Sequence, residues 1–175
     1  MNDEFEIRKL TLADAAAWRE IRLEMLQDSP NAFGRSYEEE FSQPMSWYEE
    51  RFQTAWALET GGIRGAFIGG RLVGTAGFFE NDGAKHRHAG TIWGVYVKSE
   101  FRGRGISKGI IQAIVDAAKT IPHIEQIDLT VEASNESAKK VYRALGFKTW
   151  GTHPRSIRIG DRYYDEDYMQ LYLNK

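Results

Sequence analysis

The sequence predicts one α+β domain over residues 1–175, built on a mixed, mostly antiparallel twisted sheet that is flanked by helices. The first observation is the order of the periodic segments: a strand, several helices, three strands, a helix, a strand, a helix and two strands. The second is a strand–helix–strand crossover in the middle of this order. The third is the length, which suits one ordinary hydrophobic core without a repeat, linker or low-complexity tract.

The N-terminal third combines one strand with several helices. Residues 5–10 alternate apolar and polar side chains as a short strand does, and residues 12–27, which follow Thr11, repeat apolar side chains at helical spacing. Residues 36–56 predict one or two short helices interrupted near Pro44. This segment is rich in aromatic and acidic residues, so we expect most of its aromatic side chains in the core and its glutamates in water.

The rest of the chain predicts the sheet and two more helices. The expected elements are strands at 65–70, 71–80 and 91–97, a helix at 106–119, a strand at 126–133, a helix at 135–146 and two final strands separated by a hairpin turn at 159–162. Glycine-rich or polar turns between the first three strands predict an antiparallel meander. Gly94, inside the third strand, either weakens it or marks a bulge or a close approach of the backbone.

Composition excludes several classes of function. The formal net charge of -2 argues against a protein that coats nucleic acid or an anionic membrane. No apolar run approaches the roughly 20 residues that a bilayer span needs, and the first residues lack the layout of a secretory signal, so we expect a cytoplasmic protein. With no cysteine, a disulfide framework, a thiolate metal site and a cysteine nucleophile are all excluded, and no metal is expected.

The stretch "FRGRGISKG", residues 101–109, is the strongest candidate for a binding loop because it joins a predicted strand to a predicted helix. Such a turn exposes backbone N–H groups at the positive end of a helix, which favours an anion such as phosphate. Gly103 and Gly105 let the backbone approach a ligand closely, and the cations nearby are Arg102, Arg104 and Lys108. The plainer alternative is a glycine-rich turn with solvated basic residues.

Two other phosphate-binding motifs share features with this loop. The pattern G-x-x-x-x-G-K-[ST] fails because Lys108 is followed by glycine. Gly103, Gly105 and Gly109 imitate a loose dinucleotide fingerprint, with Glu125 or Asp128 about 20 residues further on. The loop follows a meander instead of opening a repeated strand–helix–strand series, which argues against a dinucleotide enzyme but leaves it as a competing interpretation.

Two motifs resemble those of the GNAT superfamily of N-acetyltransferases. Residues 102–107, "RGRGIS", resemble its acetyl-CoA motif, with Ser107 in place of a final Gly or Ala. A later motif resembles the sequence in which an Asn is followed by Ala, Tyr, Gly and Phe, here Asn135, Ala138, Tyr142, Gly146 and Phe147. The resemblance covers the chain from about residue 61 to its end and implies a sheet in which two parallel strands splay apart.

The resemblance implies acetyl-CoA as cosubstrate and a set of residues that bind it. Backbone groups of Val95 and Val97 are expected beside the pantetheine arm. The pyrophosphate is expected at Arg102, Gly103, Arg104, Gly105, Ile106, Ser107 and Lys108. Asn135 is expected to cap its helix and to contact CoA.

Acetyl transfer to an amine requires a neutral nucleophile, stabilisation of the developing oxyanion and a proton for the departing thiolate. We assign the proton to Tyr142 and the oxyanion contact to the N–H of Val95, although Tyr142 taken alone also fits a packing residue. The absence of cysteine favours direct attack by the amine within a ternary complex. The base is not assigned: Thr91 stands where a carboxylate is sought, and the alternatives are Glu80, Glu132 and His88.

The predicted function is therefore acetyl-CoA-dependent acetylation of a primary amine, on a small molecule, a peptide or protein N-terminus, or a lysine. The aromatic and acidic first third would shape the acceptor site, and a homodimer is compatible with the sequence. Because the usual glutamate is missing, a catalytically silent CoA-binding sensor remains the alternative from another class. Nucleic acid and membranes are not expected as partners.

Overall fold

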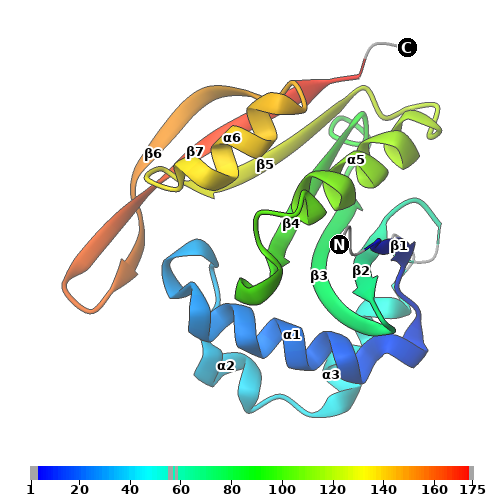
Figure 1. Ribbon diagram of the computed structural model, residues 1–175. Coiled ribbons are helices and arrows are strands. Elements are labelled where there is room, and N and C mark those ends of the chain that lie inside the picture. Colours follow the sequence, from blue (N-terminus) through cyan, green and yellow to red (C-terminus); the bar gives the residue numbers. More distant parts are fainter. Residues whose placement is uncertain (1–3, 55–56, 58, 174–175) are drawn as a thin grey trace.

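The computed structural model describes residues 4–54, 57 and 59–173 (Figure 1). The elements are β1 (Glu6–Lys9), α1 (Ala15–Asp28), α2 (Tyr37–Phe41), α3 (Met45–Glu49), β2 (Gly62–Ile68), β3 (Arg71–Glu80), β4 (Ala89–Val97), α5 (Ile106–Lys119), β5 (Gln126–Glu132), α6 (Glu136–Ala144), β6 (Lys148–Ile159) and β7 (Arg162–Tyr172). Short 3-10 turns precede α1 and follow it. Within these residues, no helix combines the length and the apolar character that a membrane span requires.

The strands form one seven-stranded sheet in the order β1-β2-β3-β4-β5-β7-β6. All neighbours are antiparallel except β4 and β5, which are parallel and are joined through α5. This confirms the predicted mixed sheet, the meander and the central crossover. The helices divide between the faces, with α1, α2 and α3 on one side and α5 and α6 on the other (Figure 1).

Each face of the sheet has its own buried core, and strand alternation separates the two. Ile92 and Trp93 are neighbours in β4 and point to opposite faces. Ile92 packs with the isoleucines of α5, whereas Trp93 packs against the cluster that contains Trp18 of α1. Trp18 is the centre of the second cluster, because Tyr48, Phe52 and Trp93 all make edge contacts with its ring.

The first third confirms part of the expected packing and corrects another part. Tyr48 and Phe52 are buried as expected, but Phe41 is 54% exposed. Glu40, expected in water, is 1% exposed, because it forms an ion pair with Arg22 of α1. Trp56, also expected among the aromatic residues of this region, lies outside the described residues.

A β-bulge interrupts β4 at Gly94, which decides between the two interpretations of this glycine. Thr75 of β3 lies opposite Tyr96, and Gly77 lies opposite Trp93, so Gly94 and Val95 together face one residue of β3. Gly94 has a φ of 60°, a conformation that glycine adopts without a steric penalty. The extra residue turns Val95 toward the face covered by α5, where it packs against the core.

β4 and β5 pair over only a short part of their length. Their parallel ladder joins Ala89–Thr91 to Gln126–Asp128, and β5 then continues against β7 as far as Glu132. From Ile92 onward β4 has no ladder partner in β5. The predicted splay of the two parallel strands is therefore confirmed, and the bulge lies in the part of β4 that has left β5.

Candidate active site

The glycine-rich loop reaches the start of α5 through two left-handed residues. Gly103 has a φ of 77° and Gly105 a φ of 79°, and an added Cβ at either position would meet no atom within 4 Å. Gly105 is the N-cap of α5 and has no side chain that could cap this helix end. Because first-turn amides lack intrahelical partners, the N–H groups of Ile106, Ser107 and Lys108 suit an anion in the open space beside the loop.

The basic residues of the loop differ in their partners. The Arg102 guanidinium donates through Nε to the carbonyl of Val97 at 2.9 Å and forms an ion pair with Asp28 of α1. It also lies over the ring of Tyr96. The structure therefore gives this side chain a position that fastens the loop to β4 and α1, and its expected contact with pyrophosphate stays a prediction. Arg104 is exposed and lies over the ring of Phe101.

Tyr142 and Asn135 lie on α6, on the same face of the sheet as α5. Asn135 caps α6 as expected, since its side-chain oxygen accepts a hydrogen bond from the N–H of Ala138 at 3.1 Å. Tyr142 is 5% exposed, makes an edge contact with Phe147 and belongs to the core that holds Ile106. Burial raises the pKa of the Tyr142 hydroxyl above its usual value, so the group keeps its proton at neutral pH.

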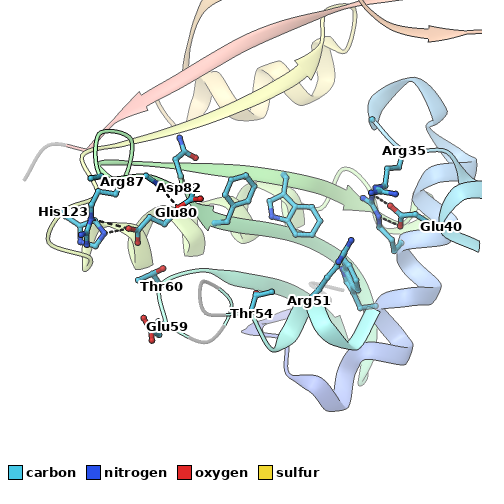
Figure 2. A pocket seen from close by; sticks show the side chains of 18 residues that line it. Arg35, Glu40, Arg51, Thr54, Glu59, Thr60, Glu80, Asp82, Arg87 and His123 are labelled. Carbon is cyan, nitrogen blue, oxygen red and sulfur yellow. Dashed lines mark hydrogen bonds and ion pairs between the residues drawn. The ribbon is translucent and has the colours of Figure 1, made fainter. Parts of the chain in front are cut away.

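A cavity of about 1180 Å³ lies on the opposite face, between the N-terminal helices and the strands β3 and β4 (Figure 2). Its aromatic lining includes Trp18, Phe79 and Trp93. One end carries Arg35, Glu40 and Arg51, and the other carries Glu80, Asp82, Arg87 and His123 (Figure 2). The volume lies somewhat above the roughly 300–1,000 Å³ usual for small-molecule sites, and the lining combines apolar and polar side chains as such sites do.

A buried ion pair lies between this cavity and the bulge. Arg22 of α1 donates to Glu40 of α2 through Nε at 2.8 Å and through Nη2 at 2.6 Å, so the pair is bidentate. Within the described residues, the hydrogen-bond contact of the third nitrogen, Nη1, is a weak one with the sulfur of Met25 at 3.7 Å. An added Cβ at Gly94 would lie 3.7 Å from Nη1, so the guanidinium borders both the bulge and the cavity.

Comparison with known proteins identifies the family. The family model described as Acetyltransferase (GNAT) family matches residues 23–147. The chain belongs to this family. The resemblance deduced from the motifs at 102–107 and 135–147 is confirmed. The match also includes the C-terminal part of α1, from Leu23 to Asp28, and the short helices α2 and α3, where the sequence carried no recognised motif.

Three curated relatives of this GNAT chain act on different amines by their names. They are L-amino acid N-acetyltransferase AaaT of Escherichia coli K12 (27% identical over 59% of this chain and 64% of the relative), L-methionine sulfoximine/L-methionine sulfone acetyltransferase of Pseudomonas aeruginosa (29%, 46% and 46%) and spermidine N(1)-acetyltransferase of Escherichia coli K12 (26%, 57% and 54%). The matches thus span between about half and just under two thirds of these relatives.

Solved structures share the fold over nearly the whole chain. A GNAT superfamily phosphinothricin acetyltransferase from Sinorhizobium meliloti, in complex with AcCoA, superposes with a TM-score of 0.84 at 20% identity, covering 97% of this chain and 88% of that one. The structure of yncA from Salmonella typhimurium, with its cofactor acetyl-CoA, gives a TM-score of 0.80 at 21% identity, covering 98% of this chain and 95% of that one. These likenesses confirm the predicted GNAT-like fold class, and family membership does not favour a dinucleotide enzyme.

The residues considered as a base are dispersed in this GNAT chain. Glu132 accepts hydrogen bonds from the N–H and the hydroxyl of Ser134, at 3.1 and 2.7 Å. His88 is exposed, and the hydroxyl of Thr91 donates to Asn81. The base stays unassigned, and the described residues contain no group of three or more His, Asp or Glu side chains that could hold a metal ion.

Glu80 is the one base candidate that the structure places in the cavity wall. Its Oε1 lies 2.9 Å from Nε2 of His123 and 3.7 Å from Nε of Arg87. It is in register with Gly90, four residues before the bulge, so it belongs to the far end of the cavity.

Arg22 and Glu40 are among the residues of the cavity that the sequence did not lead us to expect, together with Arg35 and Arg51. A signal was present, because Arg22 is four residues from both Trp18 and Leu26 on the apolar stripe of its helix. A cation on a buried stripe indicates a buried carboxylate partner.

Proposed function

We propose that the chain is an acetyl-CoA-dependent N-acetyltransferase that moves an acetyl group to a primary amine by direct attack in a ternary complex. The observation that carries this proposal is the position of the bulge. Gly94 and Val95 lie where β4 has left β5, and the Arg22 guanidinium at the wall of a large cavity borders Gly94 from the other face. A donor and an acceptor can therefore approach one point from opposite faces of the sheet.

The residues on the α5 face fit acetyl-CoA. The open space beside Gly103 and Gly105, together with the first-turn amides of α5, suits a pyrophosphate. Backbone groups of Val95 and Val97 would hold the pantetheine arm, and Asn135 would add a contact from α6. When bound, acetyl-CoA supplies the activated acetyl thioester, and two structural neighbours of this chain are named as complexes with it.

Two groups of the chain would act on the reacting atoms. The N–H of Val95 would donate to the thioester carbonyl oxygen, where negative charge develops. The Tyr142 hydroxyl, which burial keeps protonated, would hold a proton at the sulfur as the thiolate leaves. The proposed acceptor is a primary amine. The names of the curated relatives support a small molecule as acceptor. A ribosomal-protein-alanine N-acetyltransferase among the structural neighbours makes a peptide N-terminus the second class of acceptor to test.

The test is thiol release from acetyl-CoA with a panel of small amines and peptides, with the acetylated product verified by mass spectrometry. We expect release that depends on the amine. A chain that binds CoA in calorimetry but releases no thiol with any acceptor would be the silent sensor. A melting temperature raised by NAD or NADP, and not by CoA, would instead support the dinucleotide interpretation.

A further inference from the structure

The charges that line the cavity are separated by sign. One end has three guanidinium groups and one carboxylate, from Arg22, Arg35, Arg51 and Glu40. The other end has three carboxylates, one guanidinium and an imidazole, from Glu59, Glu80, Asp82, Arg87 and His123. Figure 2 shows Arg35, Glu40 and Arg51 at one side of the cavity, with Glu80, Asp82, Arg87 and His123 at the other. We call the first group the arginine end and the second the acidic end.

The arginine end has more cations than its own carboxylate can pair. Glu40 is fully engaged by Arg22 in the bidentate pair. Among the residues that the structure describes, no carboxylate lies within ion-pair distance of Arg35 or Arg51. The Arg51 guanidinium lies 3.5 Å above the ring of Trp47 and that of Arg35 lies 5.5 Å from it, so one aromatic ring holds both.

Arg51 also carries an electrostatic cost that a ligand could relieve. Burial lowers the pKa of its guanidinium. The charge of Glu40 opposes this effect, whereas the neighbouring charges of Arg35 and Arg22 act in the same direction as burial. The guanidinium stays charged, because even a lowered arginine pKa lies far above neutral. A partly buried cation without a paired anion binds a carboxylate well, since the cost of removing it from water has already been met in folding.

The arginine end lies beside the bulge. Arg22 Nη1 is 3.7 Å from the position of a Cβ on Gly94, whereas Glu80 of the acidic end is in register with Gly90. An amine that reacts at the bulge therefore has the Arg22 guanidinium next to it, with Glu40 already paired to that guanidinium, and the other carboxylates lie further along the cavity. This order matches a molecule whose anionic group is close to its amine.

We propose that the acceptor is an amine with a carboxylate on the adjacent carbon, and that Arg51, assisted by Arg35, binds this carboxylate. The inference rests on the proposed function, because it names the acceptor class of the same site. Arginine is suited to this contact, since its planar fork donates two parallel hydrogen bonds to a carboxylate. The acidic end repels the same carboxylate and so opposes the reverse orientation.

The arrangement also bears on the unassigned base. Attack requires the neutral amine, and nearby cations lower the pKa of an amine because they disfavour its protonated form. Arg22 borders the bulge, so its charge acts on an amine at Gly94, and Arg35 and Arg51 add to it. The arginine end would therefore raise the fraction of neutral amine and reduce the demand on a base.

The test compares amino acids with the amines that remain when their carboxylate is removed. The pairs are L-methionine with 3-(methylthio)propylamine, L-phenylalanine with phenethylamine and L-lysine with cadaverine. For each pair, kcat/KM is measured by thiol release in the parent, in Arg51→Gln and in the matched control Arg87→Gln at the acidic end. We define the preference as the ratio of kcat/KM for the amino acid to kcat/KM for its decarboxylated amine, and we expect this ratio to exceed one in the parent. Arg51→Gln should lower the ratio by about 10–100-fold, and Arg87→Gln should leave it unchanged.

Two further variants guard against a folding artefact. Arg35→Gln removes an exposed guanidinium and should lower the same preference by a smaller factor, and Arg51→Lys should keep part of it. A preference that survives both Arg51→Gln and Arg35→Gln, or a parent that favours the decarboxylated amines, would overturn the inference and leave the proposed function standing. Absence of thiol release with every amine would overturn both.

Discussion

Two regions of the molecule position their functional groups by different physics. From β4 to α6 the site is made by backbone geometry: the bulge at Gly94, the left-handed residues Gly103 and Gly105, and the first turn of α5. In the N-terminal third the site is made by charged side chains that meet across separate helices, as Arg22 and Glu40 do. The first region would bind the cosubstrate and the second the acceptor.

Ion pairs also fasten the N-terminal third to the rest of the chain. Glu24 of α1 pairs with Lys98 at the end of β4, and Asp28 pairs with Arg102 in the glycine-rich loop. The last residue of α1 is therefore linked to the loop that would hold the pyrophosphate. The comparison shows that glycine spacing positions the functional groups between β4 and α6, whereas contacts between residues far apart in the sequence position them in the N-terminal third.

The largest expected effect tests the region from β4 to α6 and falls on the rate. Tyr142→Phe removes one hydroxyl and keeps the ring that packs against Phe147. If the hydroxyl protonates the departing thiolate, turnover should fall by about 10²–10⁴-fold, with CoA affinity unchanged. Rates should be measured under single-turnover conditions across pH, because slow product release can hide a damaged chemical step.

Tyr48→Phe is the contrasting variant for this experiment. Its hydroxyl donates to the carbonyl of Glu40 at 2.6 Å in a fully buried position, so its loss should cost about 1 kcal/mol of unfolding free energy. No hydrogen bond of this kind involves the Tyr142 hydroxyl within the described residues, so Tyr142→Phe should leave the melting temperature nearly unchanged. Full single-turnover activity of Tyr142→Phe would exclude the hydroxyl as an essential acid.

The second effect tests the N-terminal third and falls on stability. Glu40→Leu leaves the Arg22 guanidinium buried without its carboxylate, which should cost about 3–5 kcal/mol of unfolding free energy in urea titrations. The double variant Arg22→Met/Glu40→Leu removes both charges and should recover most of the loss. A single variant as stable as the double would show that the guanidinium finds another partner and that the Arg22–Glu40 pair is not what holds α1 to α2.

The sequence predicted the region from β4 to α6 well because its determinants are local. The spacing of Gly103 and Gly105, the long apolar stripe of α5 and the Asn135 cap of α6 each act within a few residues, so strand and helix bounds agreed closely with the structure. Gly94 was recognised as unusual from its position inside a strand, and only the register of β3 showed that it forms a bulge.

The cavity could not be predicted in the same way because its contacts are long-range. Arg22 and Glu40 are 18 residues apart on different helices, and the expectation that the glutamates of this segment lie in water failed at Glu40. His123 and Glu80 meet only after β5 has been placed beside β4. Pairs of this kind depend on how helices and strands pack, which local patterns do not specify.

The third effect separates ligand binding from backbone strain at the glycine-rich loop. Gly105→Val places a branched side chain in the open space where the pyrophosphate is expected, so CoA affinity should fall by at least about 10-fold in calorimetry. Gly70→Val is a matched control, because Gly70 in the β2–β3 turn has the same φ of 79° and equally open surroundings. Both variants should lose about 1–2 kcal/mol of stability. Equal CoA affinity in the two variants would place the pyrophosphate elsewhere.

The smallest effect tests whether acid weakens an ion pair of the N-terminal third. The Asp14 carboxylate lies 2.7 Å from Arg8 and also accepts a hydrogen bond from the N–H of Thr11 at 2.8 Å. The hydrogen bond from Arg8 lowers the pKa of Asp14 to about 2, against the opposing effect of burial. Because the pKa in the folded state is below that of the unfolded chain, the stabilisation is fully present above about pH 4 and is lost as the pH falls through about 2.

Asp14→Asn should therefore cost about 1 kcal/mol at pH 7, a value reduced for solvent screening because the Arg8 side chain is 39% exposed. Urea titrations of the parent and of Asp14→Asn at pH 7, 4 and 2.5 measure the difference, which should be equal at the first two values and smaller at the third. A difference that persists undiminished at pH 2.5 would assign the role of Asp14 to hydrogen bonding at the start of the helix, since that contribution does not require its charge. A difference that shrinks on acidification would show that charge, and not backbone geometry, holds this end of the molecule.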